Sequence, residues 1–355
     1  MKHFILALSL ISLSFISLAQ TSVIPFDASN DYLNGITYSL PKTELNIIIT
    51  ARHTIEKPGP FYQYAERYLA TKEIITINNE TWQIDNIEIK SNAIADPNRT
   101  FQVAIDNNGI ANNITFAYDN IIAGVNIECS SKLGELPKAK EYTNSQISNL
   151  NTQLSFDYSV LNEDALVATS IPKMAEMVAR QIYRIRESRT ALLTADLDQL
   201  PDGEALKTML TQLDQEEAEL LAFFIGKSTT YTVTKEYHIA PDDNIKHHVI
   251  ARISTAEGLI DADNIIGEPI YLNVKGTYYK APLSDPKKEK APKGFYYNVP
   301  GKAEIIVESP DITTQATLPI AQFGYTTYLN AKITNKKTAK IFFNPELGTI
   351  LKIEK

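Results

Sequence analysis

Two stretches, SIPKMAEMVARQIYRIRESRTALL (residues 170–193) and GEALKTMLTQLDQEEAELLAFFIG (residues 203–226), have the clearest pattern in the sequence. Ser170 can accept from the free amides of a first helical turn, and Pro172 fits that turn because its missing N–H costs little there. Apolar residues then recur at steps of three and four, as in amphipathic helices. The first set is Met174, Val178, Ile182 and Ile185, and the second is Leu206, Leu210, Leu213, Leu220 and Phe224. The sequence predicts an antiparallel hairpin of two helices of about 22 residues each, which ends at Gly226.

The charges of these two helices are complementary. The first carries Lys173, Arg180, Arg184, Arg186 and Arg189 against Glu176 and Glu187, and the second carries Glu204, Asp214, Glu216, Glu217 and Glu219 against Lys207. Glu217 lies between Leu213 and Leu220, at the position where the second set would be expected to have an apolar residue. Exposed ion pairs contribute only about 0–1 kcal/mol each to stability. Pairs between the two helices would therefore determine which helices pair, and in which register, more than how stable the protein is. A solvated surface on which these charges do not pair is an equal alternative.

Strand patterns precede the hairpin. Leu45, Ile47, Ile49 and Ala51 alternate within residues 44–52, which is the period of a strand. The breaker KPGP (57–60) follows, and residues 61–69 have the spacing of a short amphipathic helix. The alternating pairs Trp82/Ile84 and Ile87/Ile89 have opposite phases. The slip at Asp85-Asn86 predicts a β-bulge or a bend.

Strand patterns also follow the hairpin. The alternating sets are Tyr231, Val233 and Tyr237; Val249, Ala251 and Ile253; Ile270, Leu272 and Val274; and Ala339, Ile341 and Phe343. After the last set, NPELG (344–348) turns the chain and Leu351 and Ile353 resume the alternation. The end of the chain therefore predicts a β-hairpin with a five-residue loop.

The predicted fold class is α+β, with strand-rich N-terminal and C-terminal domains flanking a central antiparallel helical hairpin. The predicted segments are a signal peptide (1–19), an N-terminal β-rich α+β domain (20–128), a linker (129–165), the helical hairpin (166–227), a middle β region (228–282) and a C-terminal β domain (294–355). Residues 283–293 contain two prolines and four lysines, and we expect a linker or an exposed loop there.

The first residues have the pattern of a secretory signal peptide. Lys2 and His3 form a polar start, residues 4–18 carry no charge, and Ser17 and Ala19 are small residues at a cut before Gln20. The apolar run is shorter than the about 20 residues that span a bilayer. We therefore expect export to the periplasm or the cell exterior. Because no cysteine follows the cut, we do not expect a lipoprotein, and no later apolar run predicts a transmembrane span.

Composition excludes several function classes. The chain has 355 residues and a formal net charge of -8, so it repels nucleic acid phosphate, and we expect no nucleic acid partner. The nearest of its 14 glycines, Gly294 and Gly301, are too far apart for a phosphate-binding loop or a nucleophile elbow. The sequence therefore predicts no cofactor and no identifiable catalytic residue. The single cysteine, Cys129, fits a small buried hydrophobe, while a thiol nucleophile paired with a distant histidine stays open.

Candidate metal ligands are sparse. His53, His238, His247 and His248 follow the signal peptide without a zinc-site spacing. His238 with the nearby Asp242 and Asp243 is conceivable as a weak site, but a polar loop is the better interpretation. Residues 261–264 (DADN) lack the rest of a calcium loop and fit a polar turn. We predict no metal site.

Tyrosines are the candidate binding residues. The later strand-rich part contains Tyr231, Tyr237, Tyr271, Tyr278, Tyr279, Tyr296 and Tyr297. We select Tyr231, Tyr237, Tyr271 and Tyr296, because tyrosines exposed on a sheet form contact surfaces for peptides, glycans or proteins. The high strand propensity of tyrosine explains the same enrichment without any binding role.

Several short motifs resemble a family of domains of unknown function that occurs in exported Bacteroidetes proteins of about this length. They are YSLPKT (38–43), KPG (57–59), YAERYL (64–69), RESR (186–189), LLT (192–194), DGEA (202–205), FIGK (224–227), GEPIYL (267–272) and QFG (322–324). The resemblance covers nearly the whole chain after the signal peptide. It implies a location in the bacterial envelope and carries no catalytic residues.

Three functions fit these observations. The preferred one is an exported, soluble, non-enzymatic binding or assembly module of the cell envelope, whose partner is a protein or another envelope component. The first alternative is an envelope hydrolase with scattered catalytic residues. The second is a secreted glycan-binding protein, which requires Trp82 and tyrosines in a flat exposed row. The sequence does not indicate the oligomeric state.

Overall fold

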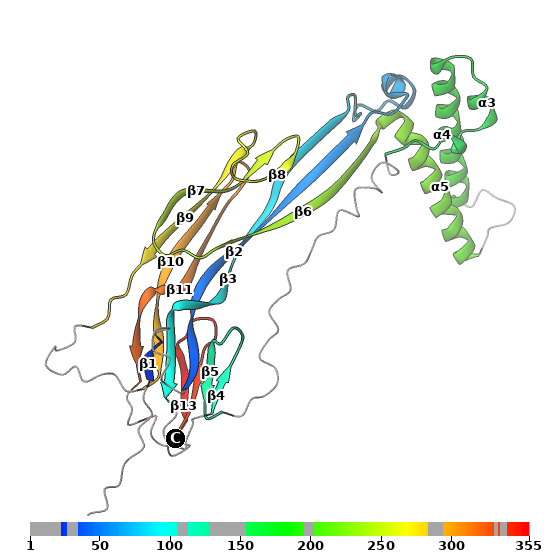
Figure 1. The fold of residues 1–355 in the computed structure, drawn as a ribbon. Coiled ribbons are helices and arrows are strands. Elements are labelled where there is room, and N and C mark those ends of the chain that lie inside the picture. Colours follow the sequence, from blue (N-terminus) through cyan, green and yellow to red (C-terminus); the bar gives the residue numbers. More distant parts are fainter. Residues whose placement is uncertain are drawn as a thin grey trace, which may run out of the picture.

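The computed structural model describes residues 23–26, 35–104, 113–127, 154–194, 202–282, 294–329, 333 and 339–354. The described part is elongated: a β-sheet body at one end continues into an arm of long strands, and the arm carries a helical head at the other end (Figure 1). Four features of the sequence analysis lie outside the described residues: the predicted signal peptide, Cys129, the first part of the predicted linker and the predicted loop at 283–293.

Two long strands form the axis of the molecule. β2 (Gly35–Lys57) and β3 (Asn79–Ala104) pair antiparallel from Gly35↔Ala104 to Glu56↔Asn79. β1 (Val23–Pro25) pairs with β3, and β6 (Lys227–Ile239) pairs with β2, so the sheet has the order β1-β3-β2-β6. At about 3.3 Å per residue, the 23 residues of β2 extend over roughly 75 Å. The arm is the outer part of β2, β3 and β6.

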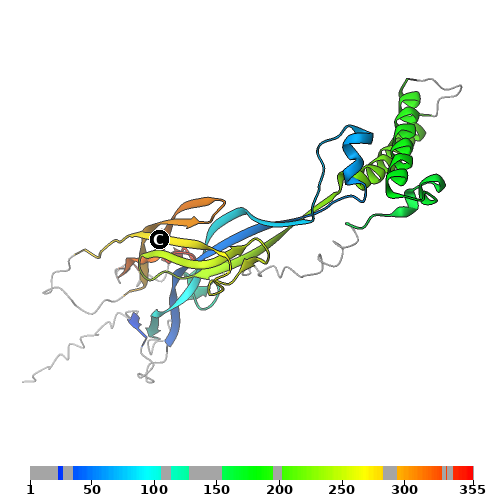
Figure 2. The same cartoon turned by 90° about the horizontal axis from the view of Figure 1, so that it is seen from above.

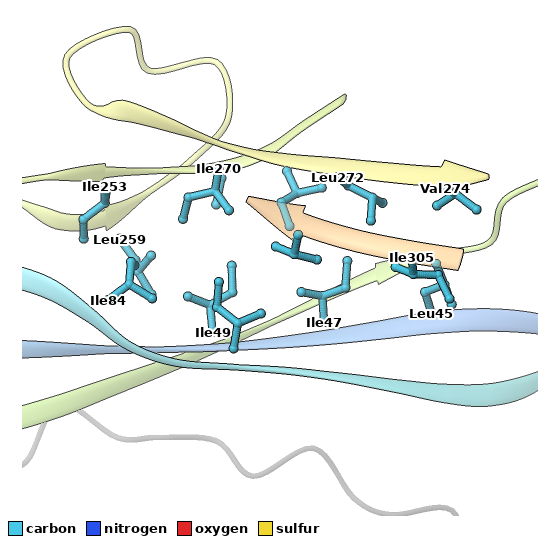
Figure 3. Packing of buried hydrophobic residues seen from close by; sticks show 14 of the residues in the cluster. Leu45, Ile47, Ile49, Ile84, Ile253, Leu259, Ile270, Leu272, Val274 and Ile305 are labelled. Carbon is cyan, nitrogen blue, oxygen red and sulfur yellow. The ribbon is translucent and has the colours of Figure 1, made fainter. Parts of the chain in front are cut away.

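A second sheet packs face to face on the first. It has the order β11-β10-β9-β7-β8, from β11 (Thr313–Tyr328), β10 (Tyr296–Glu308), β9 (Glu268–Thr277), β7 (Ile245–Ser254) and β8 (Gly258–Ile260). Figure 3 shows Leu45, Ile47 and Ile49 of β2 pointing toward Ile270 and Leu272 of β9. The predicted alternation in residues 44–52 therefore produces the inner face of a β-sandwich.

A third sheet lies at the end of the body away from the head. It contains β13 (Ile350–Glu354), β12 (Lys340–Phe343), β5 (Ile122–Val125) and β4 (Ile114–Phe116), in that order. Its apolar residues pack on Tyr38 and Phe101 of β2 and β3. The predicted C-terminal hairpin is confirmed, since Ile341 pairs with Ile353. The loop is one residue longer than predicted, because Phe343 pairs with Ile350.

The head consists of η1 (Tyr62–Tyr64) and α1 (Ala65–Leu69) from the β2–β3 connection, together with η3 (Tyr158–Val160), α3 (Glu163–Leu166), α4 (Ile171–Leu193) and α5 (Gly203–Ile225). The two long helices and the short helix at 61–69 form where the sequence predicts them. Ser170 is the N-cap of α4, although its side chain makes no capping hydrogen bond. Gly226 has φ +94, a conformation that favours glycine, and it turns the chain from α5 directly into β6.

The β-bulge predicted at Asp85-Asn86 is also confirmed. Thr50 pairs with Asn86, but Ala51 pairs with Ile84, so Asp85 is an extra residue in β3. The bulge brings both Ile84 and Ile87 into the body core.

The predicted fold class is wrong. The described residues are mostly β and form three sheets, and the helices lie at one end of the molecule instead of between two strand-rich domains (Figures 1 and 2). The reason is long-range pairing: β2 pairs with β6 and β5 pairs with β12, so strands before and after the helices share sheets. A period of two identifies a strand but not its partner. The predicted segment boundaries stay a prediction.

Candidate functional site

The candidate site lies on the head, where α4 and α5 pack antiparallel. Arg186 Nε is 2.7 Å from Glu217 Oε1, and Arg189 Nη2 is 2.7 Å from Asp214 Oδ1. Arg189 also contacts the second oxygen of Glu217. These contacts confirm that the basic helix faces the acidic one, and they fix the register of the hairpin.

Glu217 takes the place of an apolar residue between Leu213 and Leu220 of α5. It is buried, with 6% of the residue exposed. Burial alone would raise the pKa of its carboxyl group, but hydrogen bonds and charges from Arg186 and Arg189 outweigh burial and lower it. Glu217 therefore stays ionised at neutral pH between two guanidinium groups.

Beyond Glu217, toward the free end of the hairpin, the apolar side chains are not buried. Leu193 is 64% exposed and Met209 is 45% exposed. The large apolar residues of this end, all of them partly or fully exposed, are Leu192, Leu193, Leu206, Met209, Leu210 and Leu213. Within the described part of the chain, no third helix or strand covers these residues of the two helices.

A groove of about 460 Å³ runs between the two helices at this end. It is lined from α4 by Ser188, Ala191 and Leu192, and from α5 by Met209, Gln212, Leu213 and Glu216. The floor is apolar and the rim is polar, which is the composition of a contact site for another macromolecule. We call it the head groove.

The neighbouring part of the same face is covered by the chain itself. Gln181 lies seven residues before Ser188 and therefore on the same side of α4. Its Nε2 donates to the Val160 carbonyl (3.1 Å), and the Asn162 amide donates to its Oε1 (3.2 Å). Leu161 and Ala165 fill the space beside it in the head core. The segment containing η3 and α3 thus covers this face near the arm, and the head groove is its uncovered continuation.

The four candidate tyrosines lie on β6, β9 and β10, each with its own neighbours. Tyr231 contacts His53 edge to face, Tyr271 contacts His247 in the same way, and Tyr296 stacks on Phe101 at 4.1 Å. Tyr237 packs against the body core, and burial raises the pKa of its hydroxyl to about 12. Their role in binding stays a prediction.

His53, which the sequence analysis considers only as a metal ligand, lies where the body meets the arm. His53 is 5% exposed; its ring stacks on Trp82 at 4.2 Å and lies 4.8 Å from the ring of Tyr231. Burial lowers the pKa of its imidazole, while Glu80, 3.7 Å from Nε2, opposes this shift. Its place in the alternation, two residues after Ala51, is the signal that could have identified it as inward-facing.

Trp82 is not part of a flat exposed row. A Cβ added at Gly258, where the turn after β7 meets the first residue of β8, would lie 2.8 Å from the indole ring. Trp82 is thus enclosed by that turn, by His53 and by the body core. The arrangement required by the glycan-binding alternative is therefore not present at Trp82.

The candidate metal ligands each have another partner. His238 Nδ1 is 3.1 Å from Glu44 Oε2, Asp242 is 2.6 Å from Lys42 Nζ, and Asp243 accepts from the Tyr278 hydroxyl (3.0 Å). Within the described ranges, no group of three or more His, Cys, Asp or Glu residues is placed to hold a metal ion. None of the helices described here has the length and apolarity to cross a membrane.

Comparison with known proteins gives one match. A family model described as "Domain of unknown function (DUF4831)" matches residues 34–351, which includes body, arm and head. No curated protein matches the chain, and no solved structure matches it.

Proposed function

The chain belongs to the family described as Domain of unknown function (DUF4831), and from this premise we propose that it is an exported, non-enzymatic binding or assembly module of the bacterial cell envelope. In this proposal the body and arm hold the head away from the rest of the molecule. The head binds another protein through the head groove.

The head groove is the observation that carries the proposal. Six large apolar side chains gather at the free end of α4 and α5, and none of them is buried. Exposed apolar surface that is rimmed by polar residues is typical of protein contact sites. Around the groove, Gln212 and Glu216 on α5 and Ser188 on α4 provide that rim.

The arm supports the same function. β2 pairs on both sides, with β3 and with β6, as far as Lys57, so the head is carried by a three-stranded ribbon. The Phe61 amide donates to the Phe223 carbonyl (2.8 Å) within the head, and the Ile75 amide donates to the Ile225 carbonyl (2.9 Å) where the head meets the end of this ribbon. The helices α4 and α5 lie away from the body (Figure 2), so a partner can reach the groove between them without contacting the body.

The envelope location rests on the sequence. The uncharged run at residues 4–18, followed by Ser17 and Ala19 before Gln20, supports export with cleavage. N-terminal sequencing of the protein recovered from cell fractions tests this part. A chain that begins at Met1 in the cytoplasm would contradict it.

Site-specific photo-crosslinking in intact cells tests the binding function. A photoreactive residue at Met209 in the head groove should give a discrete crosslinked product at high yield. The control position is Ile266, which is also exposed but lies on the body, between β8 and β9. Crosslinks of equal yield and pattern at both positions, or none at Met209, would count against the head as the binding element.

A further inference from the structure

We propose that the head groove binds the head groove of a second copy of this chain, so that two α4–α5 hairpins form a four-helix bundle with both bodies at the same end. This inference rests on the proposed function and names the first partner. In the bundle each α4 lies between its own α5 and the α5 of the partner.

The charge of the two helices favours this arrangement. α4 carries five cationic residues against two carboxylates, and α5 carries five carboxylates against one lysine. In a bundle with a two-fold axis along its length, every pair of adjacent helices then joins opposite charges. Helices of like charge lie on the diagonals, where they are furthest apart.

At and beside the groove rim lie charges of both signs that form no ion pair within the described residues. Arg184 lies on the same side of α4 as Ser188 and Ala191, and among the described residues it has no ion pair. On α5, Glu216 and Glu219 follow Gln212 on one side of the helix. Among the described residues, each accepts from one side-chain amide: Gln181 donates to Glu216 (3.3 Å) and Gln215 donates to Glu219 (3.2 Å).

These rim charges contrast with the inner charges of the hairpin. Arg186 and Arg189 are already paired with Glu217 and Asp214. Arg184 and Glu216 thus remain for a partner, and a second copy offers the matching residue to each of them. In a two-fold interface, Arg184 contacts the partner's Glu216 while Glu216 contacts the partner's Arg184.

The shape of the groove also fits a helix pair. Ser188 and Ala191 have small side chains on the α4 side of the groove, and the long side chain of Met209 lies on the α5 side. Small residues facing large ones allow helices to approach to about 8–10 Å and interdigitate. Near the arm, the chain covers the same face with the short helix α3, so this face already accepts helical packing.

Sedimentation equilibrium on the purified full-length chain tests the inference. A Cys129→Ser background excludes disulfide-linked dimers. We expect a reversible dimer, and we expect Met209→Glu to weaken it by about tenfold or more, since a charge would be buried at the apolar floor. The matched control, Ile266→Glu, introduces the same charge at an exposed body position and should leave the dimer unchanged.

A charge exchange between two variants makes the test specific. Arg184→Glu alone and Glu216→Arg alone should each be largely monomeric, because like charges then face each other across the two-fold axis. A mixture of the two should form a heterodimer, since both contacts then join opposite charges: one with reversed sign and one as in the wild type. Because the expected result is that association is regained, a variant that fails to fold cannot produce it.

The outcomes separate the two proposals. A monomeric wild-type chain whose Met209 position still crosslinks to a different protein in cells would overturn the second-copy inference and leave the binding function standing. A monomer without crosslinks would overturn both. A dimer that is insensitive to Met209→Glu and to the charge exchange would place the self-contact elsewhere and overturn the inference.

Discussion

At the scale of single residues, His53 shows how a buried titratable group is held in a neutral state. Its ring is enclosed between Trp82 and Tyr231, and its ring nitrogens have no hydrogen-bond partner within the described part of the chain. Glu80 faces it from β3, and at 3.7 Å its carboxylate is too far for a hydrogen bond. Burial therefore dominates and lowers the pKa of His53 below the ordinary value of 6.5.

This shift predicts that acidification destabilises the protein through His53. Between the lowered pKa in the folded state and 6.5 in the unfolded state, the unfolded chain binds more protons, so stability falls as the pH falls. Denaturant unfolding measured from pH 7.5 down to about pH 5 should show this loss. His53→Phe keeps an aromatic ring beside Trp82 and should flatten the dependence.

Glu80→Gln provides the control for this prediction. Glu80 raises the pKa of His53 against the effect of burial, so its removal should lower that pKa further and steepen the loss of stability. A profile that is the same in the wild type, His53→Phe and Glu80→Gln would mean that His53 does not titrate in this range.

At the scale of elements, local pattern predicts type and position but not extent. The sequence locates α4, α5 and the bulge at Asp85, because caps and periodicity are local signals. It identifies only residues 44–52 of β2, which in fact extends over Gly35–Lys57. Pro41 conceals the rest: it lies at a register shift of the β2–β3 pairing, where a strand tolerates proline.

The head groove is only partly visible in the sequence for a similar reason. The apolar set of α5 predicts which side faces α4, but the charge pattern leaves pairing and a solvated surface as equal alternatives. The structure shows that Arg186 and Arg189 pair with the acidic helix. Residues 158–166 cover the face near the arm and leave the free end open. This arrangement depends on tertiary packing. No local pattern encodes where this cover ends.

The hairpin yields a prediction on Glu217. Glu217→Gln should destabilise the head by about 1–2 kcal/mol, because Arg186 and Arg189 lose a charged acceptor. Glu217→Leu completes the apolar set of α5 and leaves both arginines partly in water, so it should cost less, and stability should stay within about 1 kcal/mol of the wild type. Thermal unfolding followed by circular dichroism at 222 nm measures both.

The pH provides an independent check on the same residue. Because the pKa of Glu217 is lowered, its contribution is present at neutral pH and is lost as the pH falls below 4.5 through the lowered pKa. This loss begins below pH 4.5, whereas that of His53 begins below pH 6.5. A Glu217→Leu variant that is less stable than Glu217→Gln at pH 7 would show that polar contacts at position 217 outweigh the apolar packing.

At the scale of the whole molecule, the described residues form separate hydrophobic cores. The core of the sandwich and that of the third sheet both contain residues of β2 and β3. The head core draws on α1, α3, α4 and α5 and shares no residue with either. Sequence periodicity could not reveal this division, since it depends on which distant strands pair.

Separate cores predict that the head unfolds before the body. The backbone hydrogen bond Ile75–Ile225 lies where the head meets the arm, and the head core is smaller than that of the sandwich. Local opening follows such boundaries, because few apolar contacts cross them. In native-state hydrogen exchange at low protein concentration, amides of α4 and α5 should exchange at a lower opening free energy than those of Ile47 and Ile49 in β2. Glu217→Gln should lower the opening free energy of α4 and α5 alone, and an equal loss at Ile47 and Ile49 would instead show that head and body unfold as one cooperative unit.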